Sequence, residues 1–141
     1  MGNLLRVDAP HERVFHGLTE MPDLVTQILD ELSELGYTDK ERFGVRLSME
    51  EALVNAVKHG NRGDASKAVR VRYSVAEDEF TVEIEDSGPG FRPDRVPDPL
   101  EDENLMRPSG RGVFLMQHYM SSVQYNDAGN CVTMCLMRKS L

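Results

Sequence analysis

The sequence has little of what marks membrane, secreted or nucleic-acid-binding proteins. No apolar run approaches the roughly 18 residues that a membrane span needs, so no span is expected. The first residues, MGNLLRVDAPHERV, lack the long apolar stretch of a secretory signal peptide. Asp and Glu number 24 against 16 Lys and Arg, and the formal net charge of −8 argues against nucleic acid as the main partner.

Cysteine is also scarce. The two cysteines, Cys131 and Cys135, lie in a segment that alternates like a β-strand. Residues four apart in a strand are separated by about 13 Å, which is too far for a disulfide bond between them. Two free thiols indicate a reducing compartment, and we expect the cytoplasm. No His or Cys lies at ligand spacing to them, so a metal site built on them is not expected.

What is present is ordinary for a globular domain. The chain has 141 residues, 40% of them hydrophobic, which suits one domain over residues 1–141 with one core. Apolar spacing predicts a helix over about residues 24–35, and a capping box formed by Thr38 and Glu41 opens a second helix. This second helix is expected to run to about His59, with Gly60 in the left-handed C-cap conformation.

Strand patterns lie before and after these helices. Weak patterns cover Asn3–Val7 and Glu12–Gly17, and strong alternation covers residues 69–75 and 80–85. A tight turn between the last two would make opposite charges face each other across a hairpin: Arg72 with Glu83, and Arg70 with Glu85. A helix after Gly112 and a hairpin around Asp127–Asn130 close the chain.

These elements predict the fold class and one unusual loop. The fold class is α+β: a two-layer sandwich with helices on one face of a mixed, mainly antiparallel sheet. Five of the seven prolines lie between Pro89 and Pro108, in an acidic stretch. Loops this long in a compact domain are typically lids or disordered segments, and we expect a lid over about residues 91–109.

The second predicted helix carries the first candidate site. Ser48, Glu51, Asn55 and His59 form a narrow polar stripe between two apolar sides of the helix. A solvated stripe is the simpler interpretation, although a surface face more often carries Lys and Glu pairs. Glu and Asn one turn apart suit oxygen chemistry instead, because a carboxylate can take a proton and an amide oxygen can bind Mg²⁺.

The second candidate site is the segment EDSGPGF, which follows a predicted strand. Asp86 has the same strand parity as Ile84, so its carboxylate points to the core side and needs hydrogen-bond donors there. Gly88 and Gly90 remove side chains where something approaches the backbone. A buried acceptor beside such a turn suits a ligand with an amino donor, such as adenine. An Asp that simply closes a strand is the alternative.

The third candidate site is the segment SGRGVFLM. Gly110 and Gly112 precede a predicted helix start, where exposed N–H groups and the helix dipole favour a phosphate group. A flexible loop that leads into a helix is the alternative, because a G-x-G alone discriminates poorly.

The three segments together form an ordered set: E-x-x-x-N on a helix, D-x-G-x-G after a strand, and G-x-G before a helix. In this order the chain resembles the ATPase superfamily of gyrases, heat-shock chaperones, histidine kinases and mismatch-repair proteins. Its short length, with EALVNAVKHG and a late GRGVFLMQHYMSSV, is most similar to the anti-sigma-factor serine/threonine protein kinases. The resemblance covers nearly the whole chain. It implies a two-layer α+β sandwich that holds Mg-ATP beneath a mobile lid.

The resemblance also implies a role for each matching residue. Glu51 would be the general base, Asn55 the Mg²⁺ ligand, and Asp86 the carboxylate that recognises adenine. The other residues that it places around ATP are His59, Gly88, Gly90, Gly110, Gly112 and Thr133.

One position departs from the family pattern. Pro108 stands where the family often has an Arg that contacts the γ-phosphate. Arg107 lies one residue earlier and Arg111 lies within the glycine segment, so either is a candidate for that contact.

The implied function is an ATP-dependent serine/threonine protein kinase that acts as an anti-sigma factor. It would phosphorylate an anti-anti-sigma partner, sequester a sigma factor, and form a homodimer through its N-terminal strands. A non-catalytic, ATP-gated binding module of the same fold is the alternative from another class. A detached histidine-kinase ATPase domain fits less well, because no helix pair with a phospho-acceptor His is evident.

Overall fold

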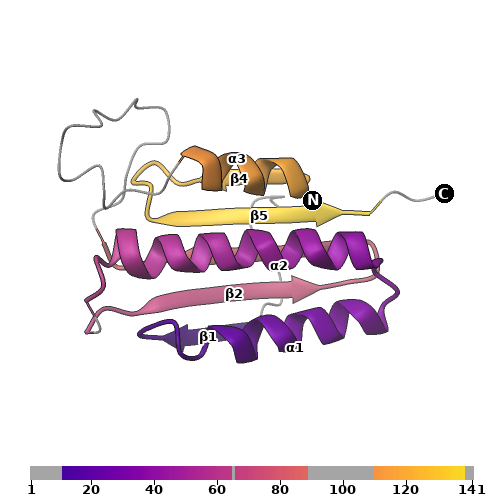
Figure 1. Cartoon of the computed structure of the whole chain (residues 1–141), viewed down its shortest axis with the longest axis horizontal. Helices are drawn as coiled ribbons and strands as arrows, with labels where there is room; N and C mark the ends of the chain where they lie inside the picture. Colours follow the sequence, from indigo (N-terminus) through magenta and orange to yellow (C-terminus); the bar gives the residue numbers. More distant parts are fainter. Residues whose placement is uncertain (1–10, 65, 89–109, 139–141) are drawn as a thin grey trace, which may run out of the picture.

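The computed structural model describes residues 11–64, 66–88 and 110–138. Within them the helices pack on one face of a five-stranded sheet of order β1-β2-β3-β5-β4 (Figure 1). The elements in chain order are β1 (His11–Phe15), α1 (Met21–Glu34), α2 (Asp39–Val54), η1 (Asn55–Gly60), β2 (Val69–Val75), β3 (Glu79–Glu85), α3 (Gly110–Tyr119), β4 (Ser122–Tyr125) and β5 (Cys131–Met137). The predicted α+β sandwich is confirmed, and every strand pairing among the described residues is antiparallel.

The central hairpin has the predicted register. Arg72 lies opposite Glu83, and Arg70 lies opposite Glu85. Arg72 Nε donates to a Glu83 carboxylate oxygen at 2.5 Å, and its Nη2 donates to Glu85 at 3.2 Å. These charged pairs lie on the face of the sheet that turns away from the helices, so they fix the strand register without occupying the core.

Of the two predicted N-terminal strands and the predicted lid, the structure describes only one strand. The strand expected at Glu12–Gly17 is present as β1, shifted toward the N-terminus. The strand expected at Asn3–Val7 and the lid expected over residues 91–109 lie outside the described residues.

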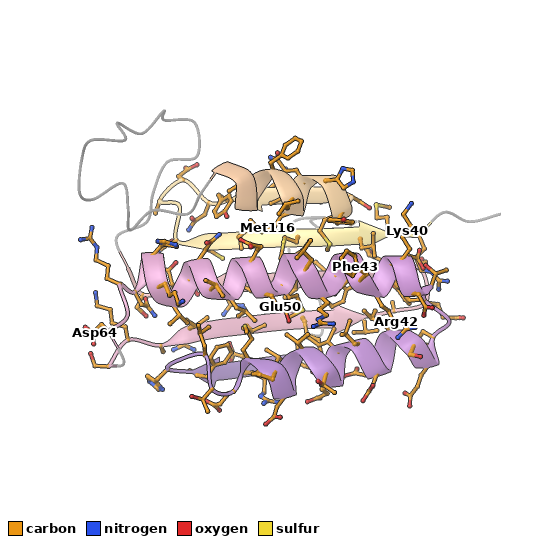
Figure 2. All side chains as sticks on the ribbon, in the orientation of Figure 1. Lys40, Arg42, Phe43, Glu50, Asp64 and Met116 are labelled. Carbon is orange, nitrogen blue, oxygen red and sulfur yellow. The ribbon has the colours of Figure 1, made fainter. Side chains whose placement is uncertain are left out.

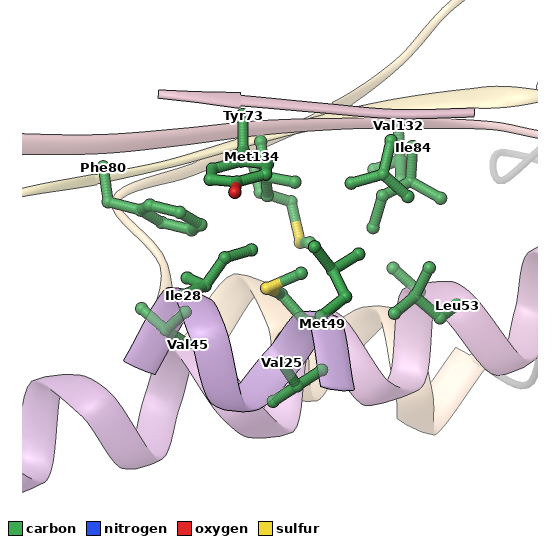
Figure 3. Close-up of a cluster of buried hydrophobic side chains, with 14 of the residues drawn as sticks. Val25, Ile28, Val45, Met49, Leu53, Tyr73, Phe80, Ile84, Val132 and Met134 are labelled. Carbon is green, nitrogen blue, oxygen red and sulfur yellow. The ribbon is translucent and has the colours of Figure 1, made fainter. Parts of the chain in front are cut away.

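The core fills the space between the helices and the sheet. Figure 3 shows side chains of α1 and α2 facing side chains of β2, β3 and β5. The labelled members are all buried: Val25, Ile28, Val45, Met49, Leu53, Tyr73, Phe80, Ile84, Val132 and Met134. Full burial of such a side chain contributes about 1.5–3 kcal/mol. This packing fixes the rotation of α2 about its axis, and with it the direction of the polar stripe.

The predicted capping box opens α2. Thr38 Oγ1 accepts a hydrogen bond from Glu41 N at 3.1 Å, and Glu41 Oε1 accepts one from Thr38 N at 2.8 Å. Both bonds satisfy amide groups that the first helical turn would otherwise leave without partners.

The end of α2 differs from the prediction. The α-helix ends at Val54 and continues as the π-helical segment η1, where Asn61 N donates to Ala56 O at 2.8 Å. The left-handed conformation predicted for Gly60 is wrong, since Gly60 lies inside η1. Positive φ angles occur instead at Arg62 (55°) and Gly63 (72°). Helical structure therefore continues to Gly60 in π-helical form, and π-helical segments are frequent at functional sites.

Helix α3 packs antiparallel against α2 (Figure 1). The sequence predicted that this helix starts after Gly112, but it begins at Gly110. Close approach is possible because Gly44 has no side chain: a Cβ there would lie 3.0 Å from Tyr119 Cβ. Phe43 packs edge-on against the Tyr119 ring, with centroids 5.6 Å apart. No helix in the described part of the chain is long and apolar enough to cross a membrane.

The two ends of the molecule have different contacts. Figure 2 shows Lys40 at the end where α2 begins and Asp64 at the opposite end, beyond η1. Near Lys40, Tyr37 donates a hydrogen bond to Ala76 O at 2.7 Å, and the Arg138 guanidinium lies 4.3 Å from the Tyr37 ring centre. These contacts tie the loop between α1 and α2 to the sheet at the end where α2 begins.

Candidate functional site

Four parts of the chain meet at the end of the molecule near Asp64. In Figure 1 the last turns of α2, the start of β5 and the start of α3 lie at this end, where η1 continues α2. The end of β3 lies there too, because Glu85 pairs with Arg70 near the start of β2 and with Cys131 at the start of β5. The three sequence segments singled out above belong to these parts. The fold therefore brings them to one region although they are far apart in the chain.

The polar stripe of α2 turns toward α3. Gly44, one turn before Ser48, lies against Tyr119, and Ser48 is 1% exposed. Glu51 lies seven residues after Gly44, and Gly112 lies seven residues before Tyr119. Since antiparallel helices have the same rise, both positions are about 10 Å further toward the Asp64 end. Glu51 is therefore level with the first turn of α3, and it is only partly buried.

The stripe contains polar atoms that need partners. Among the described residues, Ser48 Oγ, Asn55 Nδ2 and His59 Nδ1 are buried without a hydrogen-bond partner. Asn55 as a whole is 9% exposed. An unsatisfied buried polar group costs about 1–3 kcal/mol, so such a group is tolerated best where a ligand supplies the missing bond. A solvated stripe, the simpler interpretation of the sequence, does not fit this burial.

Asp86 follows β3 and is held by the turn after it. Asp86 N donates to Asn130 O at 2.9 Å, and Gly88 N donates to Asp86 Oδ1 at 2.8 Å. Burial raises the pKa of Asp86 from its ordinary 3.8 to about 6. The Gly88 amide and Lys67 lower it, and the neighbouring Glu85 raises it further. The carboxylate is charged at neutral pH but is poorly compensated by the protein alone.

Gly60 and Gly88 lie close to this carboxylate and to each other, where a side chain would not fit. A Cβ on Gly60 would lie 2.2 Å from Asp86 Oδ2, and a Cβ on Gly88 would lie 1.7 Å from Gly60 O. Neither glycine has a positive φ angle. The group that approaches the backbone at Gly88 is thus the end of η1, which brings the stripe and the Asp86 turn into contact.

The ionisation of Tyr125 is affected by both carboxylates of the site. Burial raises the pKa of Tyr125, and the negative charges of Asp86 and Glu51 raise it further. Both carboxylates are therefore close enough to one phenol to affect its ionisation. Sequence reasoning missed Tyr125, although its parity with Val123 in β4 would have placed it on the core side.

Asn61 is a second residue that sequence reasoning missed. It is 2% exposed, and its side chain bonds to the Asp86 turn and to the residues before β2. No local pattern marks it, because a polar residue after a helix-ending Gly is usually solvated.

Of the remaining predicted residues, some lie in the first turn of α3 and others lie outside the described residues. The backbone of Gly110, Arg111 and Gly112 forms the first turn of α3, at the same end as Glu51 and Asn55. Gly90 and Arg107 lie outside the described residues, so the choice between Arg107 and Arg111 stays open.

The structure does not bring Thr133 to the others. Thr133 lies opposite Glu83 and Gln124, and it alternates with Val132 and Met134, which are buried under the helices. Its side chain therefore lies on the other face of the sheet. Cys131 and Cys135 share that face and are free thiols. Burial, as the largest cause, raises the pKa of each to about 12.

The donor set suits a hard cation held jointly with a ligand. No cluster of three or more His, Cys, Asp or Glu that could hold a metal occurs in the described ranges. Mg²⁺ commonly keeps few protein ligands and takes its remaining oxygens from water and phosphate groups. The unpartnered Nδ2 of the buried Asn55 is a donor that a phosphate oxygen can satisfy, and the same carboxamide carries an oxygen of the kind that Mg²⁺ binds.

Comparison with known proteins finds relatives over most of the chain. The family model described as "Histidine kinase-like ATPase domain" matches residues 18–136. The chain is 30% identical to "Anti-sigma F factor" of Clostridium perfringens (strain SM101 / Type A) over 112 residues, covering 78% of this chain and 80% of the relative. It is 30% identical to "Serine-protein kinase RsbW" of Listeria monocytogenes (strain EGD-e) over 137 residues, covering 88% and 86%. Because this match covers most of the chain and the fold is consistent with it, the chain belongs to the histidine kinase-like ATPase domain family.

Proposed function

We propose that this protein is an ATP-dependent serine/threonine kinase that phosphorylates an anti-anti-sigma partner. One observation carries the proposal: Glu51 near the end of α2 and Asn55 at the start of η1, one turn apart, lie at the end of the molecule where α3 begins and where Asp86 follows β3. A base, a cation ligand, a phosphate-binding helix start and an amino-recognising carboxylate are thus within reach of one nucleotide.

Asp86 would bind the base of the nucleotide. Gly88 already occupies Oδ1, while Oδ2 lies beside Gly60. An adenine amino group that donates to Oδ2 would compensate a carboxylate that burial leaves poorly stabilised.

The phosphates would lie between α2 and the start of α3. Backbone N–H groups at Gly110 and Gly112 point out of the helix N-terminus, where the dipole favours negative charge. Asn55 would hold Mg²⁺, which supplies charge neutralisation across the phosphate oxygens when it is bound. Either Arg107 or Arg111 would contact the γ-phosphate.

Glu51 would act on the proton of the substrate hydroxyl. It is partly buried and, from the contact between Gly44 and Tyr119, level with the first turn of α3, so it lies near the expected phosphate end of the nucleotide. In phosphoryl transfer most catalysis comes from positioning and electrostatics. The carboxylate of Glu51 accepts the proton that the attacking Ser or Thr hydroxyl loses.

The partners are proposed from the names of the relatives. One relative is named an anti-sigma F factor and the other a serine-protein kinase. We propose that this chain likewise sequesters a sigma factor when its anti-anti-sigma partner does not occupy it. We also propose that it works as a homodimer in the cytoplasm, with residues 91–109 as an ATP lid.

A matched pair of variants tests the kinase assignment. Glu51→Gln keeps the shape of the side chain but removes the base. Glu50→Gln is the control, since Glu50 pairs with Arg46 at 3.3 Å on the exposed side of α2 (Figure 2). In single-turnover transfer from γ-labelled Mg-ATP to the partner, we expect Glu51→Gln to be slower by about 10²–10⁴-fold. Its Mg-ATP affinity should stay within a few-fold of the wild type.

The outcomes separate the two candidate functions. Transfer at the wild-type rate by Glu51→Gln would remove Glu51 as the base. A wild-type protein that binds Mg-ATP and captures its partners but transfers no phosphate would instead be the non-catalytic, ATP-gated binding module. The presence of a partly buried carboxylate at this position favours the kinase.

A further inference from the structure

The side chain of Asn61 links three segments at the site. Asn61 directly follows η1 and is 2% exposed. Its Oδ1 accepts a hydrogen bond from Ser87 N at 2.7 Å. Its Nδ2 donates to Ala68 O at 3.2 Å and to Lys67 O at 3.4 Å. One buried carboxamide thus joins the end of η1, the residues before β2, and the turn that carries Asp86.

These bonds complete the support of that turn. All three of its amide N–H groups have partners: Asp86 N donates to Asn130 O, Ser87 N to Asn61 Oδ1, and Gly88 N to Asp86 Oδ1. The first two partners come from outside the turn. Asn130 holds it from the β5 side and Asn61 from the η1 side, so the carboxylate of Asp86 has a fixed position between them.

Asn61 also sets how closely η1 approaches the turn. It follows Gly60, whose Cα lies against Asp86 Oδ2 and whose carbonyl lies against Gly88. A short bond from the next residue to Ser87 therefore holds Gly60 in that contact. Without the bond, η1 and the turn can separate, and Oδ2 can leave the place where a base would meet it.

The chemistry of the position favours a carboxamide. It must accept from one N–H and donate to two carbonyl groups, and the Asn side chain provides both functions. The three partners also determine which end of the amide is oxygen, because carbonyl groups cannot donate. Asp would supply the acceptor but would set a carboxylate oxygen against two carbonyl oxygens.

We propose that Asn61 is a positioning residue for recognition of the nucleotide base. It acts through the Ser87 amide on the Asp86 carboxylate, and so determines how strongly the site prefers a purine with an amino group at the position that Asp86 faces. This inference rests on the proposed role of Asp86 in binding adenine. It adds a residue that contacts neither the base nor the phosphates.

The test compares ATP with ITP, whose base has a carbonyl group in place of the adenine amino group. For the wild type we expect ATP to bind about ten- to a hundredfold more tightly, as the gain or loss of a charged hydrogen bond implies. Asn61→Ala should reduce this ratio to less than about threefold, mainly by weakening ATP. Calorimetry below the unfolding transition of each variant measures both ligands.

Two controls separate positioning from stability. Tyr37→Phe removes a hydrogen bond at the opposite end of the molecule and should leave the ATP-to-ITP ratio unchanged. Asn61→Asp keeps the acceptor for Ser87 N but loses both donors, so it should be less stable than the wild type and yet retain most of the ratio. If Asn61→Ala does not fold, Asn61→Ser replaces it, because its hydroxyl is too short to reach Ser87 in the same way.

The outcomes distinguish this inference from the function on which it rests. A wild type that binds ATP and ITP equally would overturn the role of Asp86 in adenine binding. A wild type that discriminates, with an Asn61→Ala variant that discriminates equally well, would overturn the role of Asn61 alone. If Asn61→Ala and Asn61→Asp both lose the preference for ATP over ITP, the bonds from Asn61 Nδ2 to Lys67 and Ala68 are what maintains it. That result would overturn the proposal that Asn61 acts through the Ser87 amide.

Discussion

Replacement of Asp86 by Asn should change nucleotide binding and stability in opposite directions. In the structure, Gly88 N donates to Asp86 Oδ1. An Asn side chain would keep its amide oxygen on this donor, which sets its NH₂ group in the place of Oδ2. Two amino groups would then face each other when adenine binds.

The expected loss of ATP affinity follows from that exchange. A hydrogen bond to a charged group contributes about 1.5–3 kcal/mol, which is about ten- to a hundredfold in Kd. The same NH₂ group can donate to the carbonyl group of ITP, so Asp86→Asn should bind ITP at least as well as ATP. Calorimetry at pH 7.5 measures both constants.

Stability without nucleotide should change the other way. Burial raises the pKa of Asp86 from 3.8 to about 6 in the folded protein, so the folded state binds this proton more tightly than the unfolded chain does. The contribution of Asp86 to stability therefore falls as the pH rises from about 4 to about 6, and stays low above that range. Asp86→Asn lacks this titration and should unfold at a higher temperature than the wild type at pH 7.5.

The pH dependence of ATP binding gives a second test of the role of Asp86. ATP affinity of the wild type should fall as the pH decreases through about 6, beyond any change that Asp86→Asn shows under the same conditions. The variant controls for protonation of the nucleotide itself. Equal ATP affinity of both proteins at pH 7.5, or parallel pH profiles, would refute the reasoning.

Two further predictions concern steric and chemical properties of named residues. Gly88→Ala would set a Cβ 1.7 Å from Gly60 O, so the turn must move; we expect a loss of about 1–3 kcal/mol in unfolding free energy and at least tenfold weaker ATP binding, and a variant with wild-type values in both assays would contradict the close contact. Burial raises the pKa of Cys131 and Cys135 to about 12, so iodoacetamide at pH 8 should modify the folded protein far more slowly than the denatured chain, and equal rates by mass spectrometry would disprove this.

Local patterns predicted the elements that local forces determine. The capping box at Thr38 and Glu41 marks the start of α2 because its two hydrogen bonds involve residues three apart. The alternation in β2 and β3, with Arg72 opposite Glu83, predicted the hairpin register because one short turn sets it. These predictions needed no knowledge of the rest of the chain.

Features that depend on distant contacts were not predictable in this way. The conformation of Gly60 depends on its contact with Asp86 and Gly88, which follow it by more than 25 residues. The side chain of Asn61 has partners on two other segments, and no pattern around it indicates burial. The sequence leaves the polar stripe ambiguous, because its burial depends on the packing of α3 beside α2.

Thr133 shows the limit of a resemblance. The resemblance of the sequence motifs implied a place near adenine for this residue, whereas its alternation with the buried Val132 and Met134 indicates the other face of the sheet. Strand parity is a steric rule with a period of two, so it is the stronger argument for which face a side chain occupies.

The central claim is that the three segments form one Mg-ATP site, and a crystal structure with Mg²⁺ and a non-hydrolysable ATP analogue tests it most directly. We expect the adenine amino group within about 3 Å of an Asp86 carboxylate oxygen. We expect Asn55 Oδ1 at about 2.1 Å from Mg²⁺, and the phosphates at the N-terminus of α3. A nucleotide bound elsewhere, or bound here with Asp86 and Asn55 out of contact, would contradict the assignment of the site.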